Sequence, residues 1–240
     1  MNLIQRILRK INGYQVQGAR WIRERPRKKL YRIYEKYRAY TMSERDVYVR
    51  NLALIEKSRA VPGAVVECGV WKGGMSAGMA ELLGEGRNYH LFDSFAGLPK
   101  AQEIDGPRAV NWQKDTASPF YYDNAAADRR FCVEAMAKTG IRSYTVHPGW
   151  FDQTLPDFRV PEGIAILRLD GDWYESTMTC LKFLFPQVNA QGLIVVDDYY
   201  AFEGCARALH DFLSRNQLGR RIRQFDNDVC HVINEDHHSL

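Results

Sequence analysis

The amino-acid sequence predicts an α/β fold built on a single, mostly parallel sheet of seven strands. Short apolar runs alternate with helical stretches through the middle of the 240-residue chain, and a glycine-rich turn follows the first of these runs. Alternation of this kind is typical of a parallel sheet with helices on both faces. Two final runs flank Asp226-Asn227-Asp228, which indicates a hairpin and therefore an antiparallel last strand.

The elements follow one another without a visible linker. A first regular helix is expected from Ser43, which has Asp46 three residues later as at a helix start, to about residue 58, and Pro62-Gly63 then breaks the chain. Strands are expected at residues 64–68, 89–92, 143–146, 164–169, 193–196, 221–225 and 229–233. Helices are expected at residues 76–83, 126–138, 175–185 and 203–215. We therefore expect one domain over residues 41–240.

The first forty residues are the most basic part of the chain. They hold 12 Lys and Arg against two Glu, whereas the other 200 residues hold 21 Lys and Arg against 27 Asp and Glu. Ile4, Ile7, Leu8 and Ile11 have the spacing of one apolar helical stripe, so residues 1–40 are expected to form an amphipathic helical arm. Two roles stay open: an arm packed on the body or on a second subunit, which is the commoner case, or a surface for anionic lipid or nucleic acid.

Composition excludes several classes of protein. With 45% hydrophobic and 26% charged residues, the chain is neither disordered nor collagen-like. Its five cysteines form no CxxC pair and are odd in number, which argues against a disulfide framework and a zinc site and favours a reducing cytoplasm. No apolar run approaches the ~20 residues of a membrane span, and we expect no secretion signal.

Acidic residues follow most of the predicted strands at their carboxyl ends, where open parallel sheets bind ligands. After Glu67, the glycines Gly69, Gly73 and Gly74 allow a tight turn to approach a ligand closely. Asp93 ends the next strand, where an acid can accept hydrogen bonds from both hydroxyls of a ribose. Together these features predict a ligand that contains a nucleoside, although the glycines alone could serve only the turn.

A second group of acids ends two further strands. Asp170 and Asp172 follow the run at residues 164–169, and Asp197 and Asp198 follow the run at residues 193–196. If these strands are neighbours, the carboxylates can converge on one hard divalent cation, for which oxygen ligands indicate Mg²⁺, Mn²⁺ or Ca²⁺. The alternative is that the acids cap the helices that follow, which stabilises a helix by ~1 kcal/mol.

The residues also resemble a known family, the macrocin O-methyltransferases (TylF family), over roughly residues 40–230. The resemblance depends on six stretches: YTM at 40–42, VVECGVWKGG at 65–74, LFDSFAGLP at 91–99, HPGWFDQTLP at 147–156, LRLDGDWYEST at 167–177 and VVDDYYAFEGC at 195–205. It implies a class I, Rossmann-like methyltransferase fold that binds S-adenosylmethionine. It also implies a Mg²⁺-dependent transfer of a methyl group to a hydroxyl, usually on a sugar.

The resemblance assigns roles to particular residues. It implies that Ser94 binds the cofactor beside Asp93 at the ribose, and that the remaining cofactor-binding residues are Glu67, Gly69, Gly73, Gly74 and Ser76. Asp170, Asp197 and Asp198 match the metal ligands, and Asp172 matches the general base that takes the hydroxyl proton. The residues of HPGWFDQTLP suggest contacts of His147 and Trp150 with the adenine, although Trp150 could equally serve packing.

The function expected from the sequence is therefore O-methylation of a sugar hydroxyl on a glycosylated natural product or a bacterial glycan. The expected partner is an acceptor with vicinal hydroxyls, and we expect a homo-oligomer without nucleic acid. One rival is a metal-dependent glycosyltransferase, because Asp170-Gly171-Asp172 also satisfies the DxD pattern. The other is a noncatalytic protein that binds a partner through its basic arm.

Overall fold

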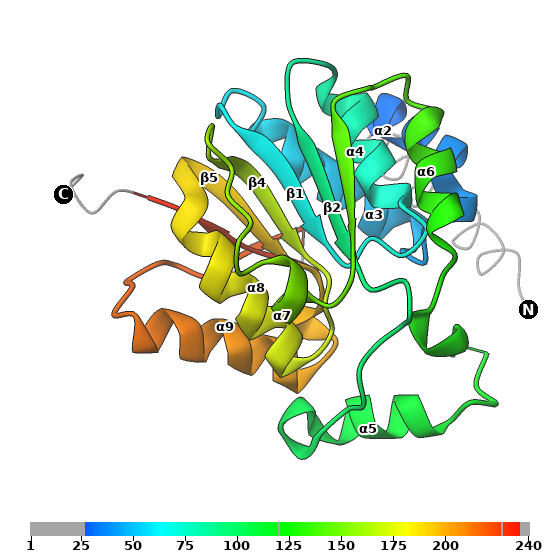
Figure 1. The fold of residues 1–240 in the computed structure, drawn as a ribbon, viewed down its shortest axis with the longest axis vertical. Helices are drawn as coiled ribbons and strands as arrows, with labels where there is room; N and C mark the ends of the chain where they lie inside the picture. The colour runs from blue at the N-terminus through cyan, green and yellow to red at the C-terminus, as the bar shows by residue number, and fades with distance from the viewer. Residues whose placement is uncertain (1–26, 120, 227, 236–240) are drawn as a thin grey trace, which may run out of the picture.

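The computed structural model describes residues 27–119, 121–226 and 228–235. This part of the chain forms one seven-stranded sheet in the order β3-β2-β1-β4-β5-β7-β6 (Figure 1). Its strands are β1 (Ala64–Cys68), β2 (Tyr89–Asp93), β3 (Tyr144–Pro148), β4 (Ile164–Leu169), β5 (Val188–Val196), β6 (Arg223–Phe225) and β7 (Val229–Ile233). The first five strands are parallel, and β7 runs antiparallel to both β5 and β6, so the predicted fold class is confirmed.

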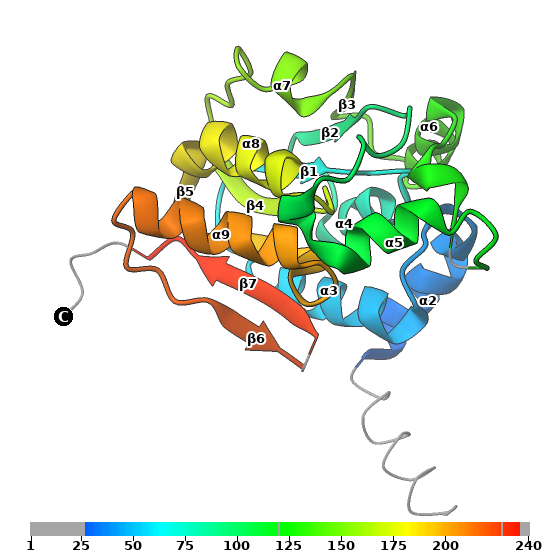
Figure 2. The same cartoon turned by 90° about the horizontal axis from the view of Figure 1, so that it is seen from below.

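Helices cover both faces of this sheet (Figures 1 and 2). The helices are α2 (Lys28–Tyr37), α3 (Arg45–Lys57), α4 (Gly74–Leu83), α5 (Gly106–Lys114), α6 (Arg129–Ala137), α7 (Phe151–Thr154), α8 (Tyr174–Leu184) and α9 (Glu203–Arg215). Because side chains alternate along a strand, Val65 joins the core beneath α2, α3, α4 and α6, whereas Val66 joins the core beneath α7, α8 and α9. The sheet therefore lies between two apolar layers.

The order of the strands reverses at β1, which lies between β2 and β4. Parallel register aligns Glu67 with Leu91 on one side and with Arg168 on the other. Open α/β sheets bind ligands in the crevice outside the carboxyl ends of the strands at such a reversal. Because these strands are parallel, the acids near the end of β1, at the end of β2 and after β4 and β5 lie at one edge of the sheet.

Several elements differ from their predicted bounds. The helix expected from Ser43 begins at Arg45, with Glu44 in the N-cap position. Strand β5 begins at Val188 rather than at residue 193, because the short 3₁₀ turn η5 (Phe185–Gln187) leads directly into it. Helices α5 and α7 were not predicted. Helix α5 starts at Gly106-Pro107, where proline suits the first turn, and α7 is too short to show a helical period.

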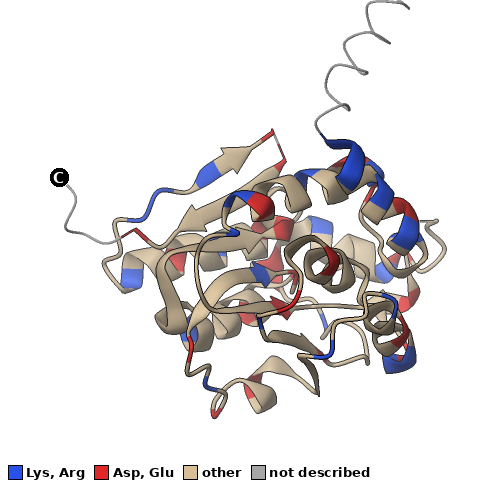
Figure 3. Ribbon diagram, turned by 90° about the horizontal axis from the view of Figure 1, so that it is seen from above, with Lys and Arg blue, Asp and Glu red and all other residues tan. Residues whose placement is uncertain are grey.

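Part of the basic arm belongs to the core. Helix α2 buries Leu30, Ile33 and Tyr37, and the hydroxyl of Tyr37 donates a hydrogen bond to Glu81 on α4 at 2.5 Å. Basic residues predominate along α2 (Figure 3). This described portion packs on the body, as in the commoner of the two expected roles. The predicted stripe at Ile4, Ile7, Leu8 and Ile11 lies outside the described residues.

In residues 27–235, apart from the undescribed positions 120 and 227, every helix is too short or too polar to cross a bilayer.

Candidate active site

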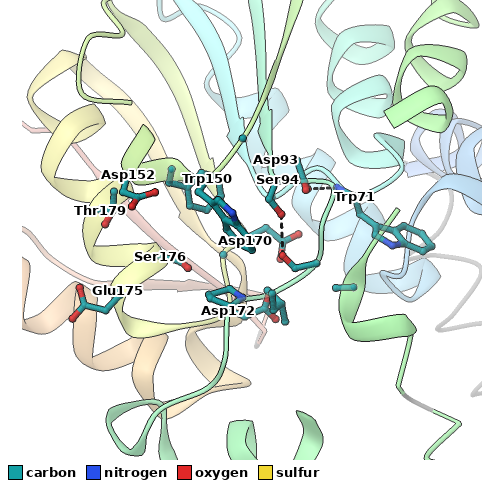
Figure 4. Close-up of a pocket in the computed structure, with 18 of the residues that line it drawn as sticks. Trp71, Asp93, Ser94, Trp150, Asp152, Asp170, Asp172, Glu175, Ser176 and Thr179 are labelled. Carbon is teal, nitrogen blue, oxygen red and sulfur yellow. Dashed lines mark hydrogen bonds between the residues drawn. The ribbon is translucent and has the colours of Figure 1, made fainter. Parts of the chain in front are cut away.

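A pocket of about 360 Å³ lies at the carboxyl ends of β1, β2 and β4 (Figure 4). The turn after β1, the loop after β2, helix α7 and the start of α8 form its walls. The described residues that line it include five carboxylates and no Lys, Arg or His, the acids being Asp93, Asp152, Asp170, Asp172 and Glu175. This lining favours a ligand that is neutral or positively charged.

The turn between β1 and α4 is packed tightly against its neighbours. Gly69 has φ +88°, and a Cβ atom at this position would lie 1.7 Å from the carbonyl oxygen of Asp170. Gly73 precedes α4, and a Cβ atom on Gly74 would lie 2.5 Å from the carbonyl oxygen of Tyr40. The packing of the turn by itself therefore requires glycine here. Gly69 also lines the pocket.

Asp93 holds this turn in place from the end of β2. Its Oδ2 accepts hydrogen bonds from the backbone N–H groups of Val70 at 2.8 Å and Trp71 at 2.7 Å, and its Oδ1 accepts from Phe95 at 2.6 Å. Burial raises the pKa of Asp93, and these backbone donors oppose that rise. A carboxylate offers about four acceptor positions, so Asp93 keeps capacity for a ligand. It lines the pocket together with Ser94.

Glu67 and Ser76 lie beneath the turn. Glu67 is 1% exposed, and it accepts hydrogen bonds from the hydroxyl of Ser76 and, at 2.7 Å, from Nη1 of Arg168. Burial raises the pKa of Glu67 to about 7, although Arg168 and Ser76 lower it. Among the described residues, the pocket lining includes neither of them, nor Gly73 and Gly74. Their contact with a cofactor stays a prediction.

Three carboxylates meet beside the pocket. Asp170 and Asp172 follow β4, and Asp198 lies in the 3₁₀ turn η6 (Asp197–Tyr200) after β5. One oxygen atom from each lies within 4.8 Å of the others. The strands β4 and β5 are neighbours, with Leu169 opposite Val196, and this register brings the acids together. The backbone N–H of Asp172, a residue with φ +57°, donates to Oδ2 of Asp198 at 3.2 Å.

The carboxylate of Asp197, which the sequence predicted as a metal ligand, contacts other side chains of the protein. Its Oδ1 lies 2.7 Å from Nη2 of Arg168 and accepts a hydrogen bond from Nδ2 of Asn51 at 3.4 Å. The structure thus gathers Asp170 and Asp198 as predicted, but Asp172 completes the group in place of Asp197. Both Asp170 and Asp197 contact the buried guanidinium of Arg168 with one carboxylate oxygen at 2.7 Å. The role of Asp197 as a ligand stays a prediction.

The electrostatics of the cluster favour a bound cation. Burial raises the pKa values of Asp172 and Asp198 well above the ordinary range of an aspartate, and neighbouring carboxylates raise them further. Burial also raises the pKa of Asp197, with Arg168 opposing it. Carboxylates this close do not all ionise without compensating charge. Oxygen donors from two adjacent strand ends suit a hard divalent cation such as Mg²⁺.

The residues of the predicted adenine region separate into two roles. Trp150 lines the pocket and is 37% exposed. His147 instead stacks on Phe92 with ring centroids 4.2 Å apart, and its Nε2 lies 3.2 Å from Nδ1 of His90. Burial, followed by the charge of His90, lowers the pKa of His147 to about 4. His147 therefore serves packing between β2 and β3, and contact of Trp150 with an adenine stays a prediction.

Sequence reasoning missed two residues that organise the site, Arg168 and Asn51. Arg168 is 1% exposed and contacts three carboxylates, and Asn51 is fully buried on α3. The signal was present in both cases. An arginine interrupts the apolar strand ILRL, and an asparagine stands among the apolar residues of VRNLALI. Buried polar residues normally have partners, so each pointed to an unseen group nearby.

The family profile described as macrocin-O-methyltransferase (TylF) matches residues 28–232. The chain belongs to this family. The match includes α2, and the boundary at residue 40 between the arm and the remaining domain stays a prediction.

Curated relatives are named as O-methyltransferases, and the substrate named for one of them carries a rhamnosyl group. A tetracenomycin 4'-O-methyltransferase of Streptomyces olivaceus, whose substrate is named 8-demethyl-8-(2,3-dimethoxy-alpha-L-rhamnosyl)-tetracenomycin-C, is 33% identical over 176 residues, covering 69% of this chain and 64% of the relative. Mycinamicin III 3''-O-methyltransferase of Micromonospora griseorubida is 31% identical, covering 69% and 66%. This chain thus spans slightly less than two thirds of the length of these relatives.

Solved structures show the same fold. The O-methyltransferase NovP superposes with a TM-score of 0.67 at 26% identity, covering 78% of this chain and 81% of NovP. The calicheamicin methyltransferase CalS11 superposes with a TM-score of 0.58 at 20% identity, covering 78% of each chain. The macrocin O-methyltransferase family member described here therefore has the class I methyltransferase fold expected from its sequence.

Proposed function

We propose that this chain transfers a methyl group from S-adenosylmethionine to a sugar hydroxyl, and that a bound divalent cation, Mg²⁺, assists the transfer. The observation that carries the proposal is the gathering of Asp170, Asp172 and Asp198 beside a pocket bounded by the turn after β1. Membership of the family supports methyl transfer over the glycosyl transfer that Asp170-Gly171-Asp172 would also allow. An acidic pocket suits a sulfonium donor better than a sugar nucleotide with its negative diphosphate.

The donor site is proposed at the reversal of the strand order. Three backbone N–H groups occupy three of the about four acceptor positions of Asp93, so Asp93 accepts a hydrogen bond from one ribose hydroxyl through the position that remains, with Ser94 beside it. The turn from Gly69 to Gly74 lies against the methionine end, and Glu67 and Ser76 support the turn from below. The exposed ring of Trp150 lies against the adenine.

The cation site is proposed at the carboxylate cluster, with Asp170 and Asp198 as ligands. Arg168 and Asn51 both engage Oδ1 of Asp197, so Oδ2 is the oxygen that Asp197 offers as the third ligand. A divalent cation, when bound, makes neighbouring hydroxyl groups more acidic. Asp172 is then the general base, which requires that its carboxylate come within about 2.6–3.2 Å of the reacting oxygen. Much of the rate should come from holding donor and acceptor in line.

The acceptor proposed is a sugar with vicinal hydroxyls, carried on a natural product or a bacterial glycan. The rhamnosyl group in the named substrate of one curated relative supports a sugar acceptor, whereas the vicinal hydroxyls rest on the proposed cation site. We also propose a homo-oligomer in the cytoplasm that binds no nucleic acid, with membrane contact through residues 1–40 left as an alternative. Five buried, unpaired cysteines suit a reducing compartment.

Labelled methyl transfer tests this proposal directly. The full chain is incubated with methyl-labelled S-adenosylmethionine and a panel of glycosides that either carry a vicinal diol or lack one hydroxyl of it. We expect transfer to a diol in Mg²⁺, none in EDTA, and recovery when Mg²⁺ is restored. Full transfer in EDTA would contradict the cation site. Thermal stabilisation by sugar nucleotides, and none by S-adenosylhomocysteine, would contradict the donor site.

A further inference from the structure

Arg168 connects the two halves of the site. Its side chain, 1% exposed, donates from Nη1 to Oε1 of Glu67 and to Oδ2 of Asp170, both at 2.7 Å, and its Nη2 lies 2.7 Å from Oδ1 of Asp197. A single planar cation thus joins β1, the end of β4 and the turn after β5. Glu67 belongs to the proposed donor side, and the two aspartates belong to the proposed cation side.

The contacts of Arg168 determine which oxygen of each aspartate is free. Asp170 gives Oδ2 to the guanidinium and keeps Oδ1, and Asp197 gives Oδ1 and keeps Oδ2. Asn51 supports the second arrangement, because its Nδ2 donates to the same Oδ1 of Asp197 from helix α3. Two buried side chains from different elements therefore hold Asp197 by one oxygen.

We propose that Arg168 is a positioning residue that fixes the orientations of Asp170 and Asp197 so that their remaining oxygens are presented to a divalent cation, with Asn51 as its second support at Asp197. This inference rests on the proposed function, which places a cation at the cluster. The geometry of the side chain matters as well as its charge. The five donors of a guanidinium form a rigid fork that reaches three carboxylates, whereas a lysine ammonium is a point charge on a flexible stem.

The test is an Arg168→Lys variant of the full chain, which keeps the charge and removes the fork. Mn²⁺ binding is measured by electron paramagnetic resonance of the free ion, and S-adenosylhomocysteine binding by calorimetry. Loss of the groups that orient metal ligands typically costs 10–100-fold in affinity, so we expect Mn²⁺ affinity to fall by about that factor. Glu67 keeps the hydroxyl of Ser76, so S-adenosylhomocysteine affinity should change by less than about threefold.

Two further variants complete the experiment. Arg50→Lys makes the same substitution at a partly exposed ion pair, that of Arg50 with Asp228 on the hairpin, and should leave Mn²⁺ affinity unchanged. Asn51→Ala removes the second support without changing any charge, and it should lower Mn²⁺ affinity by about threefold or more. It keeps the inference testable if Arg168→Lys does not fold.

Wild-type Mn²⁺ affinity in Arg168→Lys would overturn the inference, as would unchanged affinity in Asn51→Ala. A fall of both affinities together with the thermal midpoint in Arg168→Lys would also overturn it, because that result marks a role in folding alone. Failure of the wild-type chain to bind Mn²⁺ would instead contradict the cation site in the proposed function. The two failures are therefore distinguishable.

Discussion

Asp172 and the acids around it are positioned by different contacts. Arg168 engages the carboxylates of Asp170 and Asp197, whereas Asp172 is fixed through its backbone, whose N–H donates to Asp198. Within the described residues, no hydrogen bond to the Asp172 carboxylate is found. A carboxylate that is positioned by its backbone and not paired with a cation is well suited to accept a proton.

Replacement of Asp172 by asparagine tests this role. Asparagine keeps the size of the side chain and tolerates the positive φ of this position, so the turn should remain intact. We expect kcat to fall by about 100-fold or more, which is the usual contribution of a general base, while S-adenosylhomocysteine affinity stays within about twofold. Steady-state kinetics and calorimetry measure the two quantities. Asp157→Asn, at an exposed loop position, serves as the control, and normal turnover in Asp172→Asn would exclude it as the base.

For single residues, the sequence predicts where a side chain lies in the fold better than it predicts which groups that side chain contacts. The acids at the strand ends were predicted because the apolar runs in the sequence mark where the strands end. The buried partners of Asp93 and Asp197 were not predicted, because they depend on how the turn after β1 and the guanidinium of Arg168 pack in three dimensions. A carboxylate that binds backbone N–H groups and one that binds a ribose look alike in a sequence.

At the scale of elements, the register of the strands decides which loops meet. Leu169 lies opposite Val196, so the turns that follow β4 and β5 bring their acids together. The alternation of strands and helices predicted this adjacency conditionally, since it indicated a parallel sheet but not which strands are neighbours. Helix α5, which lies beyond the carboxyl ends of the strands (Figure 1), was not predicted because no apolar period follows its start at Gly106-Pro107.

We expect His147, on the edge strand β3, to make the stability of the fold depend measurably on pH. Burial lowers the pKa of His147 to about 4, below its ordinary value of about 6.5, so the unfolded chain binds more protons between these values. Stability from this group is therefore present above pH 6.5 and is lost as the pH falls toward 4. His147→Phe keeps a ring on Phe92 and removes the titration.

We expect the thermal midpoint of His147→Phe to fall less than that of the wild-type chain between pH 7 and pH 5, by about 3 °C. Between pH 7 and pH 9 the imidazole stays neutral in both folded and unfolded states, so the thermal midpoints of the two proteins should change in parallel there. Calorimetric scans across this range make the comparison. Parallel curves below pH 6.5 would mean that His147 is not shielded from water.

At the scale of the whole molecule, the strand order concentrates negative charge at one place. Because β1, β2, β4 and β5 are parallel, their carboxyl ends lie at one edge, and each has an acid near or directly after its last residue. Helix α2, which is part of the basic arm, packs on the face of the sheet opposite α8 and α9. The carboxyl edge of the sheet is therefore acidic and can hold a cation beside a sulfonium donor, whereas the basic helix α2 packs on one face of the sheet.

The central claim is that Asp170 and Asp198 share a divalent cation beside the donor pocket. A crystal of the full chain grown with S-adenosylhomocysteine and Mn²⁺, with anomalous diffraction recorded at the manganese edge, tests it most directly. We predict one anomalous peak within about 2.5 Å of an oxygen from each of these carboxylates. A fully occupied donor site with no manganese at the carboxylates, or with their oxygens too far apart to share an ion, would contradict the account.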